Sequence, residues 1–98
     1  MYNFNNKQLQ RKFKHAIDFG ITGSYNPQNI LAYQQTLFAH INAPTTYIIR
    51  GTYHQQPVIH HFNPVTNNNV IFDLADNFVS GWKLSPAQIW HLTHNNAL

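Results

Sequence analysis

The sequence predicts an α+β domain, in which two N-terminal helices and a short C-terminal helix pack on a four-stranded antiparallel sheet. From Asn6 to Asn42 apolar side chains recur every three or four positions, which is the period of a helix. The middle of the chain changes to short β-branched and aromatic runs between turn residues, a pattern typical of antiparallel strands. Near the C-terminus a Ser-Pro pair indicates the start of one more helix.

The length of 98 residues predicts a single domain that spans residues 1–98. The chain contains no cysteine, which excludes disulfides and thiolate metal sites. No apolar run approaches the roughly 20 residues of a membrane span, and the N-terminus lacks the apolar core of a signal peptide.

The first helix is predicted from Asn6 to about Phe19, because its apolar residues fall on one stripe. That stripe consists of Leu9, Phe13, Ala16 and Ile17. The opposite side of the helical wheel carries Lys7, Arg11, Lys14, His15 and Asp18. Lys12 lies three residues before His15, so these two side chains are neighbours on the helix surface. Gly20 is a favoured residue at the end of a helix.

A second helix is predicted from the N-cap residue Asn26 and from Pro27 at the first helical position. It is expected to run to about Asn42, where Ala43-Pro44 ends it. Its expected buried side consists of Ile30, Leu31, Tyr33, Leu37, Phe38 and Ile41.

Four strands follow, with turn residues between them. They are predicted at Thr46–Tyr53, Val58–Phe62, Val70–Leu74 and Phe78–Lys83. Gly51 interrupts the first strand and predicts a β-bulge there. The polar run Thr66–Asn69 is assigned to the turn before the third strand. Ser85-Pro86 opens the last helix, which is expected to end at about Thr93 or His94.

Charged residues are scarce and unevenly placed. The chain has six Lys and Arg residues and three acidic residues. Four of the basic residues lie between Lys7 and Lys14, and the acidic residues are all Asp. A concentrated basic face with few acids nearby favours a polyanionic partner such as RNA, DNA or an acidic protein.

Lys12, Lys14 and His15 combine two fixed positive charges with a group that titrates near neutrality. RNA cleavage needs a base that takes the proton of the ribose 2′-OH, an acid for the leaving 5′-oxygen, and cations that offset the charge on the phosphorane. The neighbouring lysines are expected to lower the pKa of His15 and so favour its neutral form. The alternative is a solvated amphipathic helix that carries a surface histidine.

The predicted strand Phe78–Lys83 offers a second set of groups. Gly81 permits the close approach of a ligand or of another segment. Ser80 and Trp82 fall on one face of the strand, with Lys83 on the other, so a hydroxyl and an indole are placed to hold a phosphate and to stack a base. The alternative is that Trp82 is an ordinary core residue.

The other histidines give little support for a metal site, and no cofactor is predicted. His60 and His61 are adjacent on a strand, so their side chains point to opposite faces of the sheet. His91 and His94 lie three residues apart on the last helix without a third ligand. The sequence orders typical of Ser-His-Asp hydrolases, phosphate loops and dinucleotide-binding folds are absent.

Four short motifs stand out along the chain. They are Lys12-Phe13-Lys14-His15, Asp18-Phe19-Gly20-Ile21, Gly51-Thr52-Tyr53 and Ser80-Gly81-Trp82-Lys83-Leu84-Ser85. In this order they resemble the colicin D-type ribonuclease domain, and the resemblance extends over nearly the whole chain. It implies a C-terminal toxin domain of a bacteriocin or contact-dependent inhibition system. Such a domain is delivered as part of a larger secreted or cell-surface toxin and acts in the cytoplasm of the target bacterium.

The resemblance also implies the residues that carry the activity. The catalytic residues of the family fall on His15, Lys12, Lys14, Ser80 and Trp82. His54 departs from the pattern, since we expect arginine after Gly-Thr-Tyr in relatives. A phosphate contact from His54 would therefore depend on pH, and a role as a second acid or base is the other possibility.

The prediction is thus a metal-independent endonuclease that cleaves transfer RNA in the anticodon loop and leaves 2′,3′-cyclic phosphate and 5′-hydroxyl ends. The expected partners are tRNA and a cognate acidic immunity protein that blocks the site. The expected substrate-binding residues are Lys7, Arg11, His54 and Lys83. The alternatives are a non-catalytic RNA-binding module that uses the same basic helix, and a docking site for an acidic protein alone.

Overall fold

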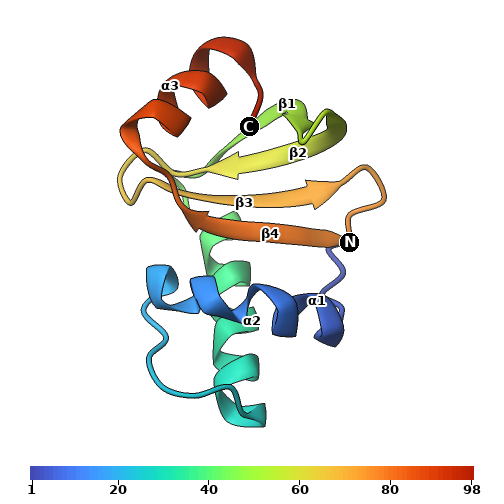
Figure 1. The fold of residues 1–98 in the computed structure, drawn as a ribbon, viewed down its shortest axis with the longest axis vertical. Helices are drawn as coiled ribbons and strands as arrows, with labels where there is room; N and C mark the ends of the chain where they lie inside the picture. The colour runs from blue at the N-terminus through green and yellow to red at the C-terminus, as the bar shows by residue number, and fades with distance from the viewer.

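The computed structural model describes residues 1–98 and confirms the predicted α+β fold (Figure 1). The helical elements are α1 (Asn6–Lys12), the 3₁₀ helix η1 (Phe13–Phe19), α2 (Pro27–Asn42) and α3 (Pro86–Asn95). The strands are β1 (Tyr47–Tyr53), β2 (Gln56–Phe62), β3 (Asn68–Asp73) and β4 (Phe78–Lys83). They form one sheet in the order β1-β2-β3-β4, and every neighbouring pair is antiparallel.

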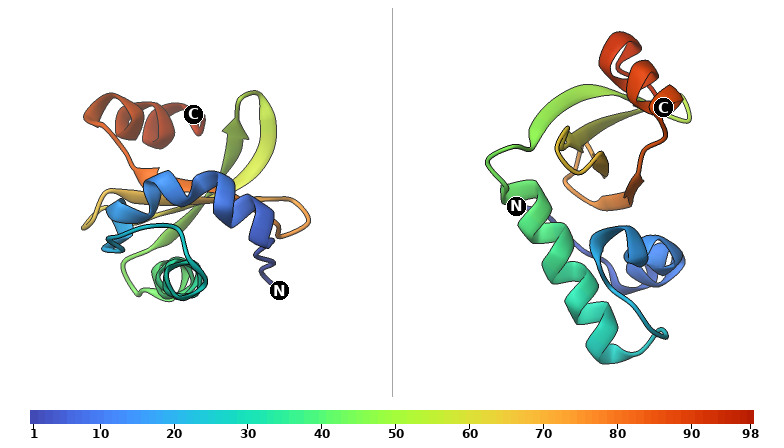
Figure 2. Two further views of the ribbon diagram at one scale, coloured as in Figure 1. Left: turned by 60° about the horizontal axis from the view of Figure 1, so that its bottom comes forward. Right: turned by 90° about the vertical axis from the view of Figure 1, so that its left-hand side faces the viewer.

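The sheet separates two layers of helices, as Figure 2 shows. On one face, α1, η1 and α2 pack over alternate residues of β3, and the main core there consists of Leu9, Ala16, Tyr33, Leu37, Val70, Phe72 and Phe78. On the other face, α3 covers a smaller core of Phe62, Leu84 and Leu92. Because successive strand residues point to opposite faces, Asn69 and Ile71 lie on the α3 side of the sheet. None of the helices has the length and apolar composition of a membrane span.

The first helical segment differs from the prediction of one continuous α-helix. It changes at Phe13 from an α-helix to a 3₁₀ helix, and Gly20 ends it with a left-handed φ of 84°. A 3₁₀ helix has three residues per turn, so residues three apart point the same way. Phe13 and Ala16 therefore both face the core, whereas Ile17 is 66% exposed and its predicted burial is wrong.

The second helix has the predicted start and end. The side chain of Asn26 caps it by accepting a hydrogen bond from the backbone N–H of Asn29. Tyr33 and Leu37 are fully buried, as expected. Leu31 and Phe38 are more than half exposed, so their predicted burial is wrong. They lie seven residues apart on one stripe, because α2 packs on the sheet and on η1 along only one of its sides.

Gly51 does not form the predicted β-bulge, because β1 and β2 pair without interruption from Tyr47 to Tyr53. The C-terminal residues run alongside β1 instead, with Thr52 N–H donating to the Asn96 carbonyl at 2.9 Å and Leu98 N–H to the Thr52 carbonyl at 3.1 Å. A Cβ atom on Gly51 would lie 1.7 Å from the Asn96 oxygen. The glycine is therefore required for this close approach. The bulge of the sheet lies between β3 and β4, beside Val79.

The last helix begins at the predicted cap. The Ser85 hydroxyl accepts from the N–H of Gln88, and the Gln88 side chain accepts from the N–H of Ser85, which completes a capping box. The helix continues to Asn95, slightly beyond the predicted end.

Three histidines are buried, and this predicts an acid-sensitive fold. His40, His60 and His61 are at most 8% exposed, and burial lowers the pKa of each. As the pH falls below about 6.5, these histidines take up protons in the unfolded chain before they do so in the folded protein, so stability is lost. Below this pH each histidine lowers the free energy of unfolding by up to about 1.4 kcal/mol per pH unit.

Urea unfolding at a series of pH values measures this effect. We expect the midpoint to be constant above neutrality and to fall steadily below it. A His91→Gln variant is the control, since His91 is exposed on α3 and its removal should leave the pH dependence unchanged. A midpoint that does not change on acidification would contradict the prediction.

Candidate active site

The structure brings His15 of η1 next to Trp82 of β4, although 67 positions separate them in the sequence numbering. Their ring centroids lie 6.0 Å apart at an interplanar angle of 36°. Both side chains are partly exposed. β4 is an edge strand of the sheet, and η1 packs along it. The two segments with the strongest sequence signals therefore meet at one sheet edge.

Asp18 fixes this contact between η1 and the sheet. Its Oδ2 accepts the backbone N–H of Lys83 at 3.0 Å, and its carbonyl oxygen accepts from the Asn68 side chain at 3.1 Å. In a 3₁₀ helix Asp18 lies directly one turn after His15. The same residue thus docks the helix on β3 and β4 and sets the position of His15 beside Trp82.

The surroundings of His15 favour its neutral form. Burial lowers its pKa most, and the charge of Lys14 lowers it further. The carboxylate of Asp18 acts in the opposite direction, and Lys12 adds a smaller lowering effect. The expected influence of the lysines on this pKa is thus confirmed in direction, although burial is the larger cause. A neutral imidazole with a free nitrogen can accept a proton at neutral pH.

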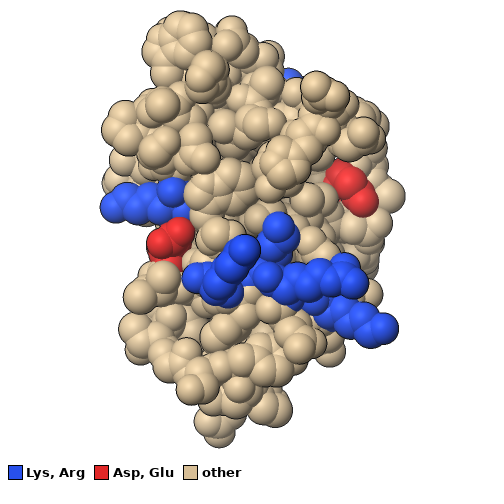
Figure 3. Space-filling model, viewed as in Figure 1, with Lys and Arg blue, Asp and Glu red and all other residues tan.

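Four of the six Lys and Arg residues belong to α1 and η1, and basic side chains gather across the middle of one face below β4 (Figure 3). The single ion pair of the structure joins the N-terminal amine to Asp76 at 3.3 Å. No Lys or Arg therefore has a carboxylate partner within 4.0 Å, and their charges are available to a ligand. Lys7 and Arg11 flank an open polar depression on this face together with Gln10. Lys83 is exposed at the end of β4, beside the Asp18 anchor.

Ser80 and Trp82 lie on the α3 face of β4, as the alternation predicts. Trp82 is half-buried, and its indole N–H donates to the Gln88 side chain at 3.2 Å. Ser80 is only 1% exposed, and its hydroxyl has no hydrogen-bond partner. Buried hydroxyls in folded proteins are usually paired with a protein group or with ordered water.

Asn69 belongs to the same site, and the sequence did not indicate it. It is fully buried on β3, pairs with Trp82 in the sheet register, and its Oδ1 has no partner. Its amide nitrogen lies 3.0 Å from His60 Nδ1, and His60 Nε2 lies 3.0 Å from the Thr52 carbonyl. Since a carbonyl only accepts, His60 carries its proton on Nε2 and accepts from Asn69 at Nδ1. These two hydrogen bonds hold the Asn69 side chain in place, with its amide nitrogen paired and its oxygen without a partner.

His54 joins the site indirectly. It lies in the turn after β1, where its ring stacks on Tyr53 with centroids 4.0 Å apart. Tyr53 in turn lies 5.7 Å from Trp82. His60 and His61 point to opposite faces as predicted, since His61 bonds Tyr2 in the main core at 3.0 Å. No group of three His or Asp residues is arranged to hold a metal ion.

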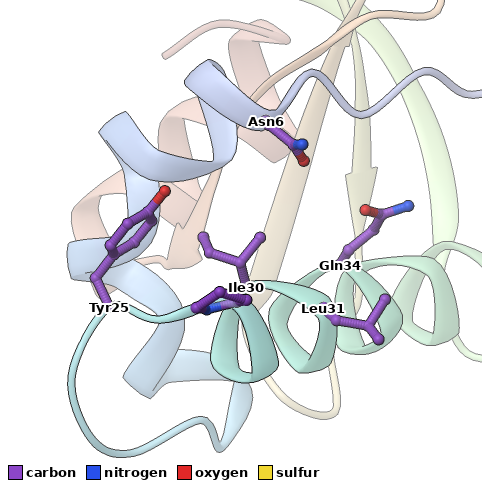
Figure 4. Close-up of a pocket in the computed structure, with 6 residues that line it drawn as sticks. Asn6, Tyr25, Ile30, Leu31 and Gln34 are labelled. Carbon is purple, nitrogen blue, oxygen red and sulfur yellow. The ribbon is translucent and has the colours of Figure 1, made fainter.

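The structure has hollows away from this site as well. Figure 4 shows one of about 320 Å³ between α1 and α2, lined by Asn6, Tyr25, Pro27, Ile30, Leu31 and Gln34. None of the predicted site residues lines it. The chemistry-bearing groups are instead concentrated at the β4 edge, where an imidazole and cations without carboxylate partners can act on a phosphate.

Comparisons with known proteins identify relatives of the chain. The family description Colicin D matches residues 8–92. Colicin-D from Escherichia coli is 36% identical over 85 residues, which cover 85% of this chain and 12% of that protein. A solved structure described as a ribonuclease from Escherichia coli complexed with its inhibitor protein superposes with a TM-score of 0.81 at 32% identity. That match covers 90% of this chain and 98% of the other.

Proposed function

The chain belongs to the Colicin D family, and we propose that it is an endoribonuclease toxin that cleaves transfer RNA in the anticodon loop. The observation that carries the proposal is the contact between His15 and Trp82 beside cations that lack carboxylate partners. The match to a solved ribonuclease supports the reaction class. The site needs no metal for this reaction, because its own side chains supply the base and the positive charge.

In the proposed mechanism His15 accepts the proton of the ribose 2′-OH. The 2′-oxygen then attacks the adjacent phosphorus, and the bond from phosphorus to the 5′-oxygen breaks. Lys12 and Lys14 offset the negative charge that develops on the phosphorane. The products are a 2′,3′-cyclic phosphate and a 5′-oxygen that takes a proton from water and leaves as a hydroxyl.

The remaining residues bind the RNA around the reacting phosphate. Trp82 offers a ring beside His15, and the buried Ser80 completes the pocket from the same face of β4. Lys7 and Arg11, which flank one polar depression, extend the positive surface along the backbone of the RNA. Lys83 contacts the RNA from the end of β4, and His54 contacts it from the turn after β1.

A small acidic immunity protein is the proposed inhibitor. The solved relative is complexed with its inhibitor protein, and the basic face of this chain would attract a partner of opposite charge. The chain corresponds to 12% of Colicin-D, so the proposal includes a larger toxin that is secreted or displayed and that delivers this part into the target bacterium.

The decisive experiment is digestion of total tRNA by the purified chain in the presence of EDTA, with both ends of each fragment mapped. We expect discrete cuts in the anticodon loop, with cyclic phosphate and 5′-hydroxyl ends. Cleavage that stops when EDTA is added would overturn the metal-independent mechanism. A stable complex with intact tRNA, whose affinity falls steeply with salt, would show a non-catalytic RNA-binding module instead.

A further inference from the structure

Four aromatic rings form a row that leads away from the proposed reaction centre. The row runs from His15 to Trp82, then to Tyr53 and His54, with successive centroids 6.0, 5.7 and 4.0 Å apart. Its members come from η1, from β4 and from the end of β1. These elements are far apart in the sequence, so the row exists only in the folded chain.

The curvature of the sheet creates this row. β1 and β4 are the two edge strands, and the sheet bends until their inner faces approach each other, as the right-hand view of Figure 2 shows. Tyr53 thus meets Trp82 across the sheet. His54 has a left-handed φ of 50°, and its N–H donates to the carbonyl of Leu98 at 3.0 Å. This turn folds the His54 ring back onto Tyr53.

A cavity of about 550 Å³ opens beside the far end of the row. Tyr53 and His54 form one wall, and Val58 and Val79 form apolar parts of the others. Gln56 lines the cavity and has an amide without a hydrogen bond to the protein, whereas the carboxylate of Asp73 is occupied by Ala75 and Asn77. The cavity has the size of a small-ligand site and combines aromatic walls with one free polar group.

We propose that this cavity is a nucleobase subsite of the endonuclease. A base of the cleaved loop leaves the RNA stack and lies against the ring of Tyr53, with His54 completing the platform and Gln56 at the edge of the base. Proteins recognise single-stranded loops of RNA by stacking splayed bases on aromatic rings. His54 acts here through its ring face, since it already lies flat on Tyr53, rather than as a phosphate contact. This inference rests on the proposed function, because it names the substrate group held beside that site.

The test measures the binding of an anticodon stem-loop whose loop carries 2′-deoxyribose, so that it cannot be cleaved. Single abasic positions are placed one at a time through the loop. For the wild-type chain we expect one or two abasic positions to weaken binding about tenfold or more, and the others to have little effect. For Tyr53→Leu the same abasic positions should weaken binding only slightly, because the aromatic ring on which the base stacks is absent.

Three further variants separate stacking from folding. Tyr53→Phe should retain wild-type sensitivity to the abasic positions. Tyr47→Leu is the matched control, because it removes a tyrosine from the same face of β1 at its other end. His54→Asn removes the ring and suits the left-handed turn, so it keeps the test valid if Tyr53→Leu fails to fold. Equal abasic effects in the wild type, Tyr53→Leu and His54→Asn would overturn the subsite.

This binding experiment is independent of catalysis. If the chain failed to cut unmodified tRNA, the proposed function would be wrong, whereas the coupling between Tyr53 and an abasic position would still be measured. If the chain cut tRNA but showed no such coupling, only the subsite would be wrong.

Discussion

Replacement of His15 by alanine is expected to lower the rate of tRNA cleavage by about a thousandfold, because general-base catalysis contributes roughly 10²–10⁴ to such reactions. The lysines of the basic face remain in this variant, so tRNA binding should change by less than about threefold. Single-turnover cleavage with the chain in excess measures the chemical step separately from binding. Cleavage at the wild-type rate would exclude His15 from the mechanism.

The pH dependence of cleavage gives this prediction a second readout. The rate should rise with pH as His15 loses its proton and should reach its plateau by neutrality, since burial and Lys14 lower its pKa. Lys14→Gln removes one of these causes, so the rising limb should move to higher pH in addition to any loss of rate. His91→Ala, which removes an exposed histidine of α3, should leave both the rate and its pH profile unchanged.

Much of the fold could be predicted because local signals agreed with the tertiary structure. The Asn26-Pro27 and Ser85-Pro86 pairs define helix starts by their own side-chain and ring chemistry. The change to a 3₁₀ helix at Phe13 had no such local signal. It depends on the packing of Phe13 and Ala16 on the core, which favours a spacing of three.

The candidate site could be predicted only in part. His15 and the Ser80–Trp82 strand were expected to form its two halves, and the structure places His15 beside Trp82. Asn69 was assigned to a polar turn, because nothing in the sequence shows that β3 already begins at Asn68. Tyr53 reaches Trp82 only through the curvature of the sheet, which sequence periodicity does not contain.

Replacement of Gly51 by valine is expected to destabilise the fold by about 3 kcal/mol, near the upper end of the cost of overpacking. Any Cβ at this position would overlap the backbone of Asn96, which is not a flexible side chain that can move aside. The C-terminal segment must therefore detach, and the hydrogen bonds that join Asn96 and Leu98 to Thr52 and His54 are lost. Urea unfolding of the wild-type chain and of Gly51→Val measures the difference in their free energies of unfolding.

A chain that ends at Asn95 separates this overlap from the strand propensity of valine. In the full chain Gly51→Val should be strongly destabilising. In the shortened chain no backbone occupies the space beside position 51, and valine favours a strand over glycine by up to about 1 kcal/mol. The same substitution should then be neutral or stabilising, although the shortened chain itself is less stable than the full one. An equal loss in both chains would mean that Gly51 is required by the β1–β2 pairing itself and not by the approach of the C-terminus.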